Sequence, residues 1–259
     1  MDLRFDTAEL ADRRDRIISF IRRLHDDAGA DGAVIGLSGG VDSSLTAALA
    51  VEALGRESLY GLSMPASVSA QRHQSDAEAM AEHLDIRFDI VEIEPGVETL
   101  VSALPHETVG TVARGNSRAR VRAVLTYLVA NEENRLVLGT GNRTEALVGY
   151  FTKYGDGAVD CHPIGNLYKC QVRQLAREMD VPDSIVTKPA TAELWSDQTD
   201  EDELGIDYDT LDVILAMHVD GPLPRHRTAD LADCDVETVD RVVDMVDRSA
   251  HKRAVPPSP

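Results

Sequence analysis

Lysine is almost missing from this chain of 259 residues. Four lysines stand beside 22 arginines, and 45 acidic residues leave a formal net charge of −19. The charge argues against nucleic acid as a main partner, because binding a phosphate backbone needs a basic surface. A surplus of carboxylates with few lysines is typical of a protein adapted to high salt, where screening makes a net negative surface tolerable.

Long apolar runs and cysteines are scarce as well. No apolar run is long enough to span a bilayer, and the first residues do not form a signal peptide, so we expect a cytoplasmic protein without a membrane partner. Cys161, Cys170 and Cys234 are an odd number without zinc-site spacing, which predicts neither a disulfide framework nor structural zinc. The hydrophobic content of 43% is sufficient for a full core.

A glycine-rich stretch, Gly-Leu-Ser-Gly-Gly-Val-Asp-Ser at residues 36–43, is the first candidate site. It joins an apolar run to a segment of helix-forming residues. A strand, a tight turn and a helix N-terminus present N–H groups to an anion, and glycines let a phosphate approach closely. The stretch has no lysine and is therefore no Walker A motif. Asp42 suits a Mg²⁺ ligand beside phosphates, but Asp42 and Ser43 could equally be ordinary helix caps.

Alternating apolar segments predict the fold. Strands are expected at residues 33–37, 58–62, 88–93 and 136–139, helices at 7–25, 69–84, 116–132, 208–218 and 236–250, and a long loop at 187–207. This order favours an α/β fold, a doubly wound parallel sheet flanked by helices. Right-handed crossovers place the loop after the first strand at the carboxyl edge of the sheet, where such folds bind ligands.

The chain is interpreted as a single domain, residues 1–259. Its core, 30–190, forms the sheet, and an acidic helical part of the same domain follows at 191–255. From Glu193 to Asp247 there are 17 acidic residues, three arginines and no lysine. This composition favours a solvated helical surface.

A second carboxylate follows the fourth predicted strand. The spacing of Asn142 and Glu145 predicts a helix capping box. Glu145 would also lie at the carboxyl edge of the sheet and face Asp42. Two carboxylates beside ATP phosphates make an ordinary Mg²⁺ shell. The two roles are compatible, and we predict Asp42 and Glu145 as metal ligands.

The four lysines lie in stretches that look functional on other grounds: Lys153, Lys169, Lys188 and Lys252. Elsewhere the chain uses arginine for its positive charges. A compact ammonium cannot be replaced by a guanidinium at every phosphate, so we favour phosphate-binding roles over coincidence.

The glycine stretch resembles the Ser-Gly-Gly-x-Asp-Ser signature of ATP pyrophosphatases, which have a Rossmann-like topology and split ATP into AMP and pyrophosphate. The whole chain resembles ammonia-dependent NAD synthetase. The resemblance runs in order from about residue 33 to 253, through residues 115–122, 139–145, 149–157, 163–164, 167–169, 188–195, 198–201 and 251–253. The sequence departs from the family at Ser196-Asp197, where a Pro-Gly pair is frequent, and lacks the family's aromatic, acidic segment after Arg253.

The resemblance implies a homodimer that amidates deamido-NAD with ATP and ammonia, and Mg²⁺ as the cofactor. The residues implied for ATP are Gly36, Leu37, Ser38, Gly39, Gly40, Val41, Asp42, Ser43, Thr140, Lys169 and Thr191. Those implied for deamido-NAD are Arg120, Lys153, Asp160, His251 and Lys252.

The chemistry needs no catalytic nucleophile from the protein. The nicotinate carboxylate would attack the α-phosphate of ATP, pyrophosphate would leave from an acyl-adenylate, and ammonia would displace AMP. No glutamine-hydrolysing segment precedes residue 33, so free ammonia or a separate partner is expected to supply the nitrogen.

Two alternatives stay open. One is another ATP pyrophosphatase, either a different amide ligase or an enzyme such as a tRNA-thiolating or a GMP-forming ligase, against which the 149–157 segment speaks. The other is a non-catalytic nucleotide-binding protein of the stress type, with similar topology and no turnover. Pyrophosphate release that depends on deamido-NAD and ammonium would separate the three.

The composition predicts a stability that depends on salt. Raising KCl from low to multimolar concentration should raise the melting temperature steeply, because screening weakens the repulsion among the 45 acidic side chains. Thermal melts followed by circular dichroism over a KCl series measure this dependence. A flat response would remove the argument for salt adaptation.

Overall fold

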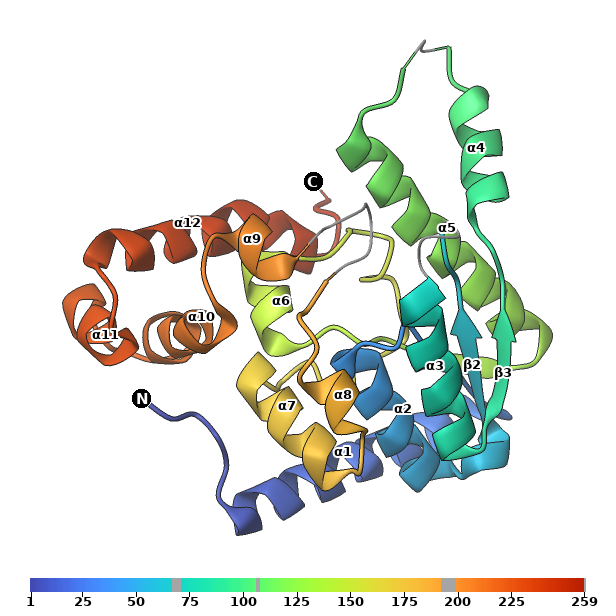
Figure 1. The fold of residues 1–259 in the computed structure, drawn as a ribbon, viewed down its shortest axis with the longest axis horizontal. Coiled ribbons are helices and arrows are strands. Elements are labelled where there is room, and N and C mark those ends of the chain that lie inside the picture. Colours follow the sequence, from blue (N-terminus) through green and yellow to red (C-terminus); the bar gives the residue numbers. More distant parts are fainter. Residues whose placement is uncertain (67–70, 106–107, 192–198, 259) are drawn as a thin grey trace.

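A parallel β-sheet lies at the centre of the computed structural model, which describes residues 1–66, 71–105, 108–191 and 199–258 (Figure 1). The strands of the described chain are β1 (Gly32–Gly36), β2 (Leu59–Ser63), β3 (Arg87–Ile90) and β4 (Arg135–Leu138), in the order β3-β2-β1-β4. All neighbouring pairs are parallel. The predicted α/β class is confirmed.

The central strand β1 is buried on both faces. Ala33 and Ile35 belong to the core on one face of the sheet, and Val34 belongs to the core on the other. Val34 pairs with Tyr60 of β2 and Val137 of β4, and both lie in the same core as Val34. A strand that alternates between two apolar cores accounts for the uninterrupted apolar run in the sequence.

Helices cover both faces. The first core holds residues of α1 (Thr7–Ala28), α2 (Val41–Leu54), α3 (Gln71–Leu84), α7 (Lys169–Glu178) and α8 (Asp183–Val186). On the other face lies α5 (Thr111–Glu132), with α4 (Glu94–Ser102) packed beside it. A short 3₁₀ turn, η1 (Arg56–Ser58), leads into β2.

The C-terminal helices form a third core with a helix from the sheet part. They are α9 (Asp200–Leu204), α10 (Tyr208–Ile214) with its π-helical continuation η3 (Leu215–Val219), α11 (Arg225–Ala232) and α12 (Val236–Arg253). Leu147 and Val148 of α6 (Arg143–Val148) pack in this core with Leu211 and Val239. Figure 1 shows α10, α11 and α12 on the far side of α6 from β2 and β3. The acidic part therefore shares apolar contacts with the sheet part, and the boundary at residue 191 stays a prediction.

Some predicted boundaries are wrong. The helix expected from Asn116 begins at Thr111, with Gly110 as its N-cap. Asn116 lies inside α5 and accepts a hydrogen bond from the Thr152 hydroxyl at 2.8 Å. The strand expected over 88–93 ends at Ile90, because Pro95 belongs to the first turn of α4. The expected loop 187–207 contains α9, while its residues 192–198 lie outside the described chain.

The prediction of a solvated acidic surface at residues 193–247 is only partly right. Most described carboxylates there are exposed or half-exposed, but Asp200 and Asp212 are buried. Composition could not reveal this, because two buried acids do not alter a strongly acidic average. Across the described residues, no helix combines the length and the low polarity needed to cross a bilayer.

Candidate active site

The glycine-rich stretch forms the turn between β1 and α2, at the carboxyl edge of the sheet. Gly36 ends β1, Leu37 is buried in the core, and Val41 is the first residue of α2. Gly39 has a φ of 79°, a left-handed conformation that favours glycine. Gly40 is the N-cap of α2 and offers no side chain to the first N–H groups of the helix. The turn is therefore suited to an anion.

Two serines hold the turn in shape. The Ser38 hydroxyl accepts from the Gly40 N–H at 3.3 Å and lies 3.1 Å from the Ser43 hydroxyl. Ser43 donates to the Gly40 carbonyl at 3.1 Å. The alternative in which Asp42 caps α2 is wrong, because no side chain caps this helix and Asp42 points to other partners.

Asp42, Glu145 and Lys169 meet at this edge of the sheet. The Lys169 ammonium donates to Asp42 Oδ2 at 2.7 Å and to Glu145 Oε1 at 3.0 Å. Lys169 is only 1% exposed, and the two carboxylates are mostly buried. Residues far apart in the chain thus bring two negative charges onto one positive charge. The predicted proximity of Asp42 and Glu145 is what the structure shows.

Asn142 links the two carboxylates from the other side. Its side-chain amide donates to Asp42 Oδ1 at 2.8 Å, and its Oδ1 accepts from the Glu145 N–H at 2.9 Å. The Asn142 N–H in turn donates to Glu145 Oε2, which completes the predicted capping box. Glu145 therefore contributes one oxygen to the helix cap and the other to Lys169. The capping box is confirmed, and a role at the site remains compatible with it.

Burial and the neighbouring charges shift the pKa values of Glu145 and Lys169. Burial raises the pKa of Glu145 to about 7; Lys169 opposes this shift and Asp42 adds to it. Burial also disfavours the Lys169 ammonium, but Asp42 and Glu145 outweigh it and hold its pKa above the usual range. The Lys169 ammonium lies between Asp42 Oδ2 and Glu145 Oε1. The two oxygens are therefore near enough to bind the same metal ion.

These two carboxylates fit magnesium. No group of three or more His, Cys, Asp or Glu side chains arranged for a metal occurs among the described residues. Mg²⁺ commonly takes one or two carboxylates and completes its shell with substrate phosphates and water. A pair of acids beside an anion-binding turn matches that mode better than a closed protein cage.

The C-terminal part supplies residues that the sequence analysis missed. The Tyr208 ring lies against Lys169, with the ammonium 4.9 Å from the ring centroid. The Tyr208 hydroxyl donates to Asp200 Oδ2 at 2.8 Å, and both residues are buried. Asp200 belongs to a quoted motif, residues 198–201, which hinted at this part of the chain. Nothing in the sequence pairs Tyr208 with Lys169, because 38 intervening positions separate them.

Of the remaining residues implied for ATP, Thr140 lies at the same edge of the sheet. Thr140 follows the end of β4, and β4 is the parallel neighbour of β1. Thr191 is half-buried and precedes residues 192–198, which lie outside the described chain and include the second half of the quoted 188–195 motif. Lys188 donates to Asp76 Oδ2 of α3 at 2.6 Å and so ties this segment to α3.

Four of the residues implied for deamido-NAD surround residues 149–154. Arg120 donates to the Lys153 carbonyl at 3.2 Å, and the Lys153 ammonium donates to the His251 carbonyl at 2.5 Å. The Lys252 ammonium donates to the carbonyls of Gly149 and Phe151, at 2.7 and 2.9 Å. The end of α12 is thereby fastened to the glycine-rich segment.

Asp160 is the fifth residue of this set, and its hydrogen bonds in the described part of the chain go to residues outside the set. Its carboxylate accepts from the Tyr127 hydroxyl at 2.9 Å and from the Val137 N–H at 2.8 Å. Tyr127, the partner of Asp160, and Arg120 line one shallow hollow on the outer side of α5.

Comparisons with known proteins show the family to which the chain belongs. The profile of the NAD synthase family matches residues 14–256. The chain belongs to the NAD synthase family. An NH(3)-dependent NAD(+) synthetase of Halobacterium salinarum is 58% identical over 100% of this chain and 97% of its own length. One of Methanosarcina acetivorans is 45% identical over 95% of this chain and 96% of its own. The predicted family is confirmed.

Solved structures of NAD synthases and related enzymes share the fold. The NMN synthetase of Francisella tularensis superposes with a TM-score of 0.84 at 33% identity, over 96% of this chain and 98% of its own. The NH3-dependent NAD synthetase of Campylobacter jejuni superposes with a TM-score of 0.81 at 27% identity, with the same coverage. The predicted topology is therefore that of the family.

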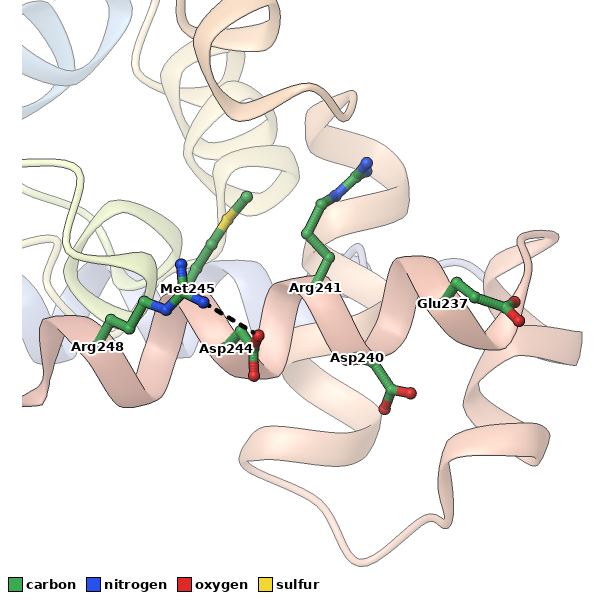
Figure 2. A pocket seen from close by; sticks show the side chains of 6 residues that line it. All are labelled: Glu237, Asp240, Arg241, Asp244, Met245 and Arg248. Carbon is green, nitrogen blue, oxygen red and sulfur yellow. Dashed lines mark hydrogen bonds and ion pairs between the residues drawn. The ribbon is translucent and has the colours of Figure 1, made fainter.

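A second shallow hollow, of about 440 Å³, lies along α12 of this NAD synthase (Figure 2). Its lining carries both signs of charge: Glu237, Asp240, Arg241, Asp244, Met245 and Arg248. Arg248 pairs with Asp244 at 3.5 Å, as the dashed line in Figure 2 shows, and Arg241 donates to the Gly205 carbonyl at 3.0 Å. None of the predicted site residues lines it. This hollow is a charged helix face and not the active site.

Burial of Glu145 predicts a pH-dependent stability. Its pKa in the folded protein, about 7, lies above the ordinary 4.5, so the folded state holds the proton more tightly. The stabilisation of the folded state by protonated Glu145 is fully present below pH 4.5 and is lost as the pH rises through 7. In metal-free buffer, the free energy of unfolding of wild type relative to Glu145→Gln should fall over this range by on the order of 1–3 kcal/mol.

Urea titrations at pH 5 and 7.5 measure this difference. The exposed Glu57 offers a matched control, since Glu57→Gln removes a carboxylate that water already solvates. The raised pKa would be contradicted if the free energies of unfolding of wild type and Glu145→Gln differed by the same amount at pH 5 and at pH 7.5.

Proposed function

We propose that this chain makes NAD from deamido-NAD, ammonia and ATP, and releases AMP and pyrophosphate. The observation that carries the proposal is the meeting of Asp42, Glu145 and Lys169 beside an anion-binding turn, in a chain 58% identical over its full length to an NH(3)-dependent NAD(+) synthetase. The sequence-based prediction of an ammonia-dependent NAD synthetase is confirmed by these relatives. A non-catalytic stress-type protein would not account for them.

The turn and Lys169 suit the departure of pyrophosphate. The N–H groups of residues 38–43 and the N-terminus of α2 would bind the phosphates of ATP, where negative charge grows as the bond to the α-phosphate breaks. Mg²⁺, held by Asp42 and Glu145, would neutralise part of that charge. Lys169 would exchange a carboxylate oxygen for a phosphate oxygen, since its ammonium already contacts Asp42, which lies in the first turn of α2 beside the glycine-rich turn.

The organic substrate would lie against the positive residues near 149–154. Arg120, Lys153, His251 and Lys252 would face the phosphates of deamido-NAD. A direct contact of Asp160 with the substrate would compete with its bonds to Tyr127 and Val137. The protein would act through position and charge, because the substrate carboxylate and ammonia are themselves the nucleophiles of the two steps.

A mononucleotide substrate is the second candidate. The solved structure with a TM-score of 0.84 is an NMN synthetase, 33% identical to this chain. The NH(3)-dependent NAD(+) synthetase of Halobacterium salinarum is more similar in sequence, at 58% identity. Sequence similarity therefore favours deamido-NAD, and the two substrates can be compared in one assay.

The purified chain should form NAD from deamido-NAD, ATP and ammonium, as detected by mass spectrometry. Asp42→Asn should lower the rate by about 100-fold or more, because it removes a negative charge from the metal and phosphate site. Asp240→Asn, on the exposed face of α12, is the matched control and should keep the rate.

Three further arms define the substrates. Nicotinate mononucleotide should give a lower kcat/KM than deamido-NAD, and glutamine in place of ammonium should give no rate above background. Pyrophosphate should appear only when deamido-NAD and ammonium are both present with ATP. A preference for the mononucleotide, or ATP binding without any amide product, would overturn the proposal.

We also propose that the protein is a homodimer joined through the outer side of α5. Val124 and Leu128 lie one turn apart on this helix and are 61% and 59% exposed. They line a hollow of about 500 Å³ together with Tyr154 and the proposed substrate residue Arg120. Large apolar side chains exposed side by side favour a protein partner, and a second copy would bury them next to the substrate residues.

Replacing Val124 and Leu128 by glutamate should convert the dimer to monomer, because two charges would enter an apolar contact. Sedimentation equilibrium measures the mass of the wild type and of this double variant. Val255→Glu, at an exposed position near the C-terminal end, is the control. A monomeric wild type would refute the proposal.

Three broader proposals concern the environment and the partners of the protein. The charge of −19 and the similarity to an enzyme of Halobacterium salinarum support adaptation to high salt. A cytoplasmic location would place the enzyme with its co-substrate ATP. The same charge supports the prediction that nucleic acid is not a partner.

A further inference from the structure

Asp212 is a buried carboxylate without a salt bridge. It lies in α10, is 0% exposed, and has no cationic partner in the described part of the chain. Its oxygens accept from the Thr144 hydroxyl at 2.5 Å and from the Cys170 N–H at 2.8 Å. Burial raises the pKa of Asp212, while these hydrogen bonds lower it. A buried acid that is neither paired nor exposed is costly, so its position calls for an explanation.

The partners of Asp212 lie in the first turns of the two helices that build the active site. Thr144 precedes Glu145 in α6, and Cys170 follows Lys169 in α7. The Thr144 hydroxyl also accepts from the Lys169 N–H at 3.0 Å. The first N–H groups of a helix have no partner within it, and here Thr144 and Asp212 satisfy two of them in α7.

We infer that Asp212 is a positioning residue for the proposed ATP and metal site. Through Thr144 it holds the starts of α6 and α7 together, so that the Lys169 ammonium reaches Glu145. This inference rests on the proposed function of Lys169 and Glu145. The contact it protects is short, 3.0 Å from Nζ to Oε1, and a displacement of about 1 Å at such a site can cost 100-fold in rate.

A second buried threonine in the C-terminal part has no such partners. Thr228 of α11 is also 0% exposed, and its hydroxyl forms no hydrogen bond with a described residue. Thr144 differs because its hydroxyl connects two helices that each carry a site residue.

The two threonines provide a matched pair of variants. Binding of α,β-methylene-ATP with Mg²⁺ is measured by calorimetry, below the melting temperature of every variant. Thr144→Val should raise Kd by about 10–100-fold, as is usual for partners that orient ligand-binding groups. Thr228→Val should change it less than about twofold, although it alters a threonine of equal burial.

Conservative variants separate hydrogen bonding from charge. Asp212→Asn can still accept from Cys170 and donate to Thr144, so it should bind within about threefold of wild type, while Asp212→Ala should resemble Thr144→Val. Thr144→Ser keeps the hydroxyl, so it should also bind the analogue nearly as tightly as wild type. In a Lys169→Met background, Thr144→Val should raise Kd by less than about a further twofold, because the Lys169 ammonium that Thr144 positions is gone.

Several results would overturn the inference. One is an equal Kd for Thr144→Val and Thr228→Val. Another is an equal rise in Kd in Asp212→Asn and Asp212→Ala. Additivity of Thr144→Val with Lys169→Met would do so too, since Asp212 would then act elsewhere. Failure of the proposed function gives a different signature: a wild type that binds the analogue but forms no NAD.

Discussion

The ammonium of Lys169, held between Asp42 and Glu145, is the interaction on which the site depends. Two carboxylates this close, in a mostly buried place, repel each other unless a cation lies between them. The lysine supplies that cation, because its ammonium donates to both carboxylates. Such a site suits a metal ion, which would bind the two carboxylates, and a phosphate, which would bind the ammonium.

The same lysine explains why the acidic C-terminal part matters to the active site. Tyr208 lies against the ammonium, Asp200 accepts from Tyr208, and Asp212 supports the start of the helix that carries Lys169. Asp220 adds an outer contact, because it pairs with Arg143 of α6 and accepts from the Tyr168 hydroxyl at the N-cap of α7. The carboxylates of this region therefore do more than solvate a surface: a few of them join its helices to the site.

The scarcity of lysine acquires a structural meaning here. Lys169 bridges two acids, Lys188 ties the segment after α8 to α3, and Lys153 and Lys252 bond to backbone carbonyls near the proposed substrate site. A carbonyl or a narrow gap between carboxylates suits a compact ammonium better than a planar guanidinium. In this structure the four lysines lie in confined places, and the phosphate contacts predicted for them remain proposals.

The parallel α/β sheet, the anion-binding turn, the capping box of Asn142 and Glu145, and the NAD synthase family were all predictable from the sequence. The elements, the turn and the cap depend on local periodicity and spacing, and the family depends on short motifs that occur in order along the chain. The sequence did not reveal that Asn142 binds Asp42, that Tyr208 covers Lys169, or that Asp212 joins α6 to α7. These contacts follow from how the helices pack. They join residues up to 100 positions apart, and whether an acid in an acidic region faces water or a helix N-terminus depends on packing and not on composition.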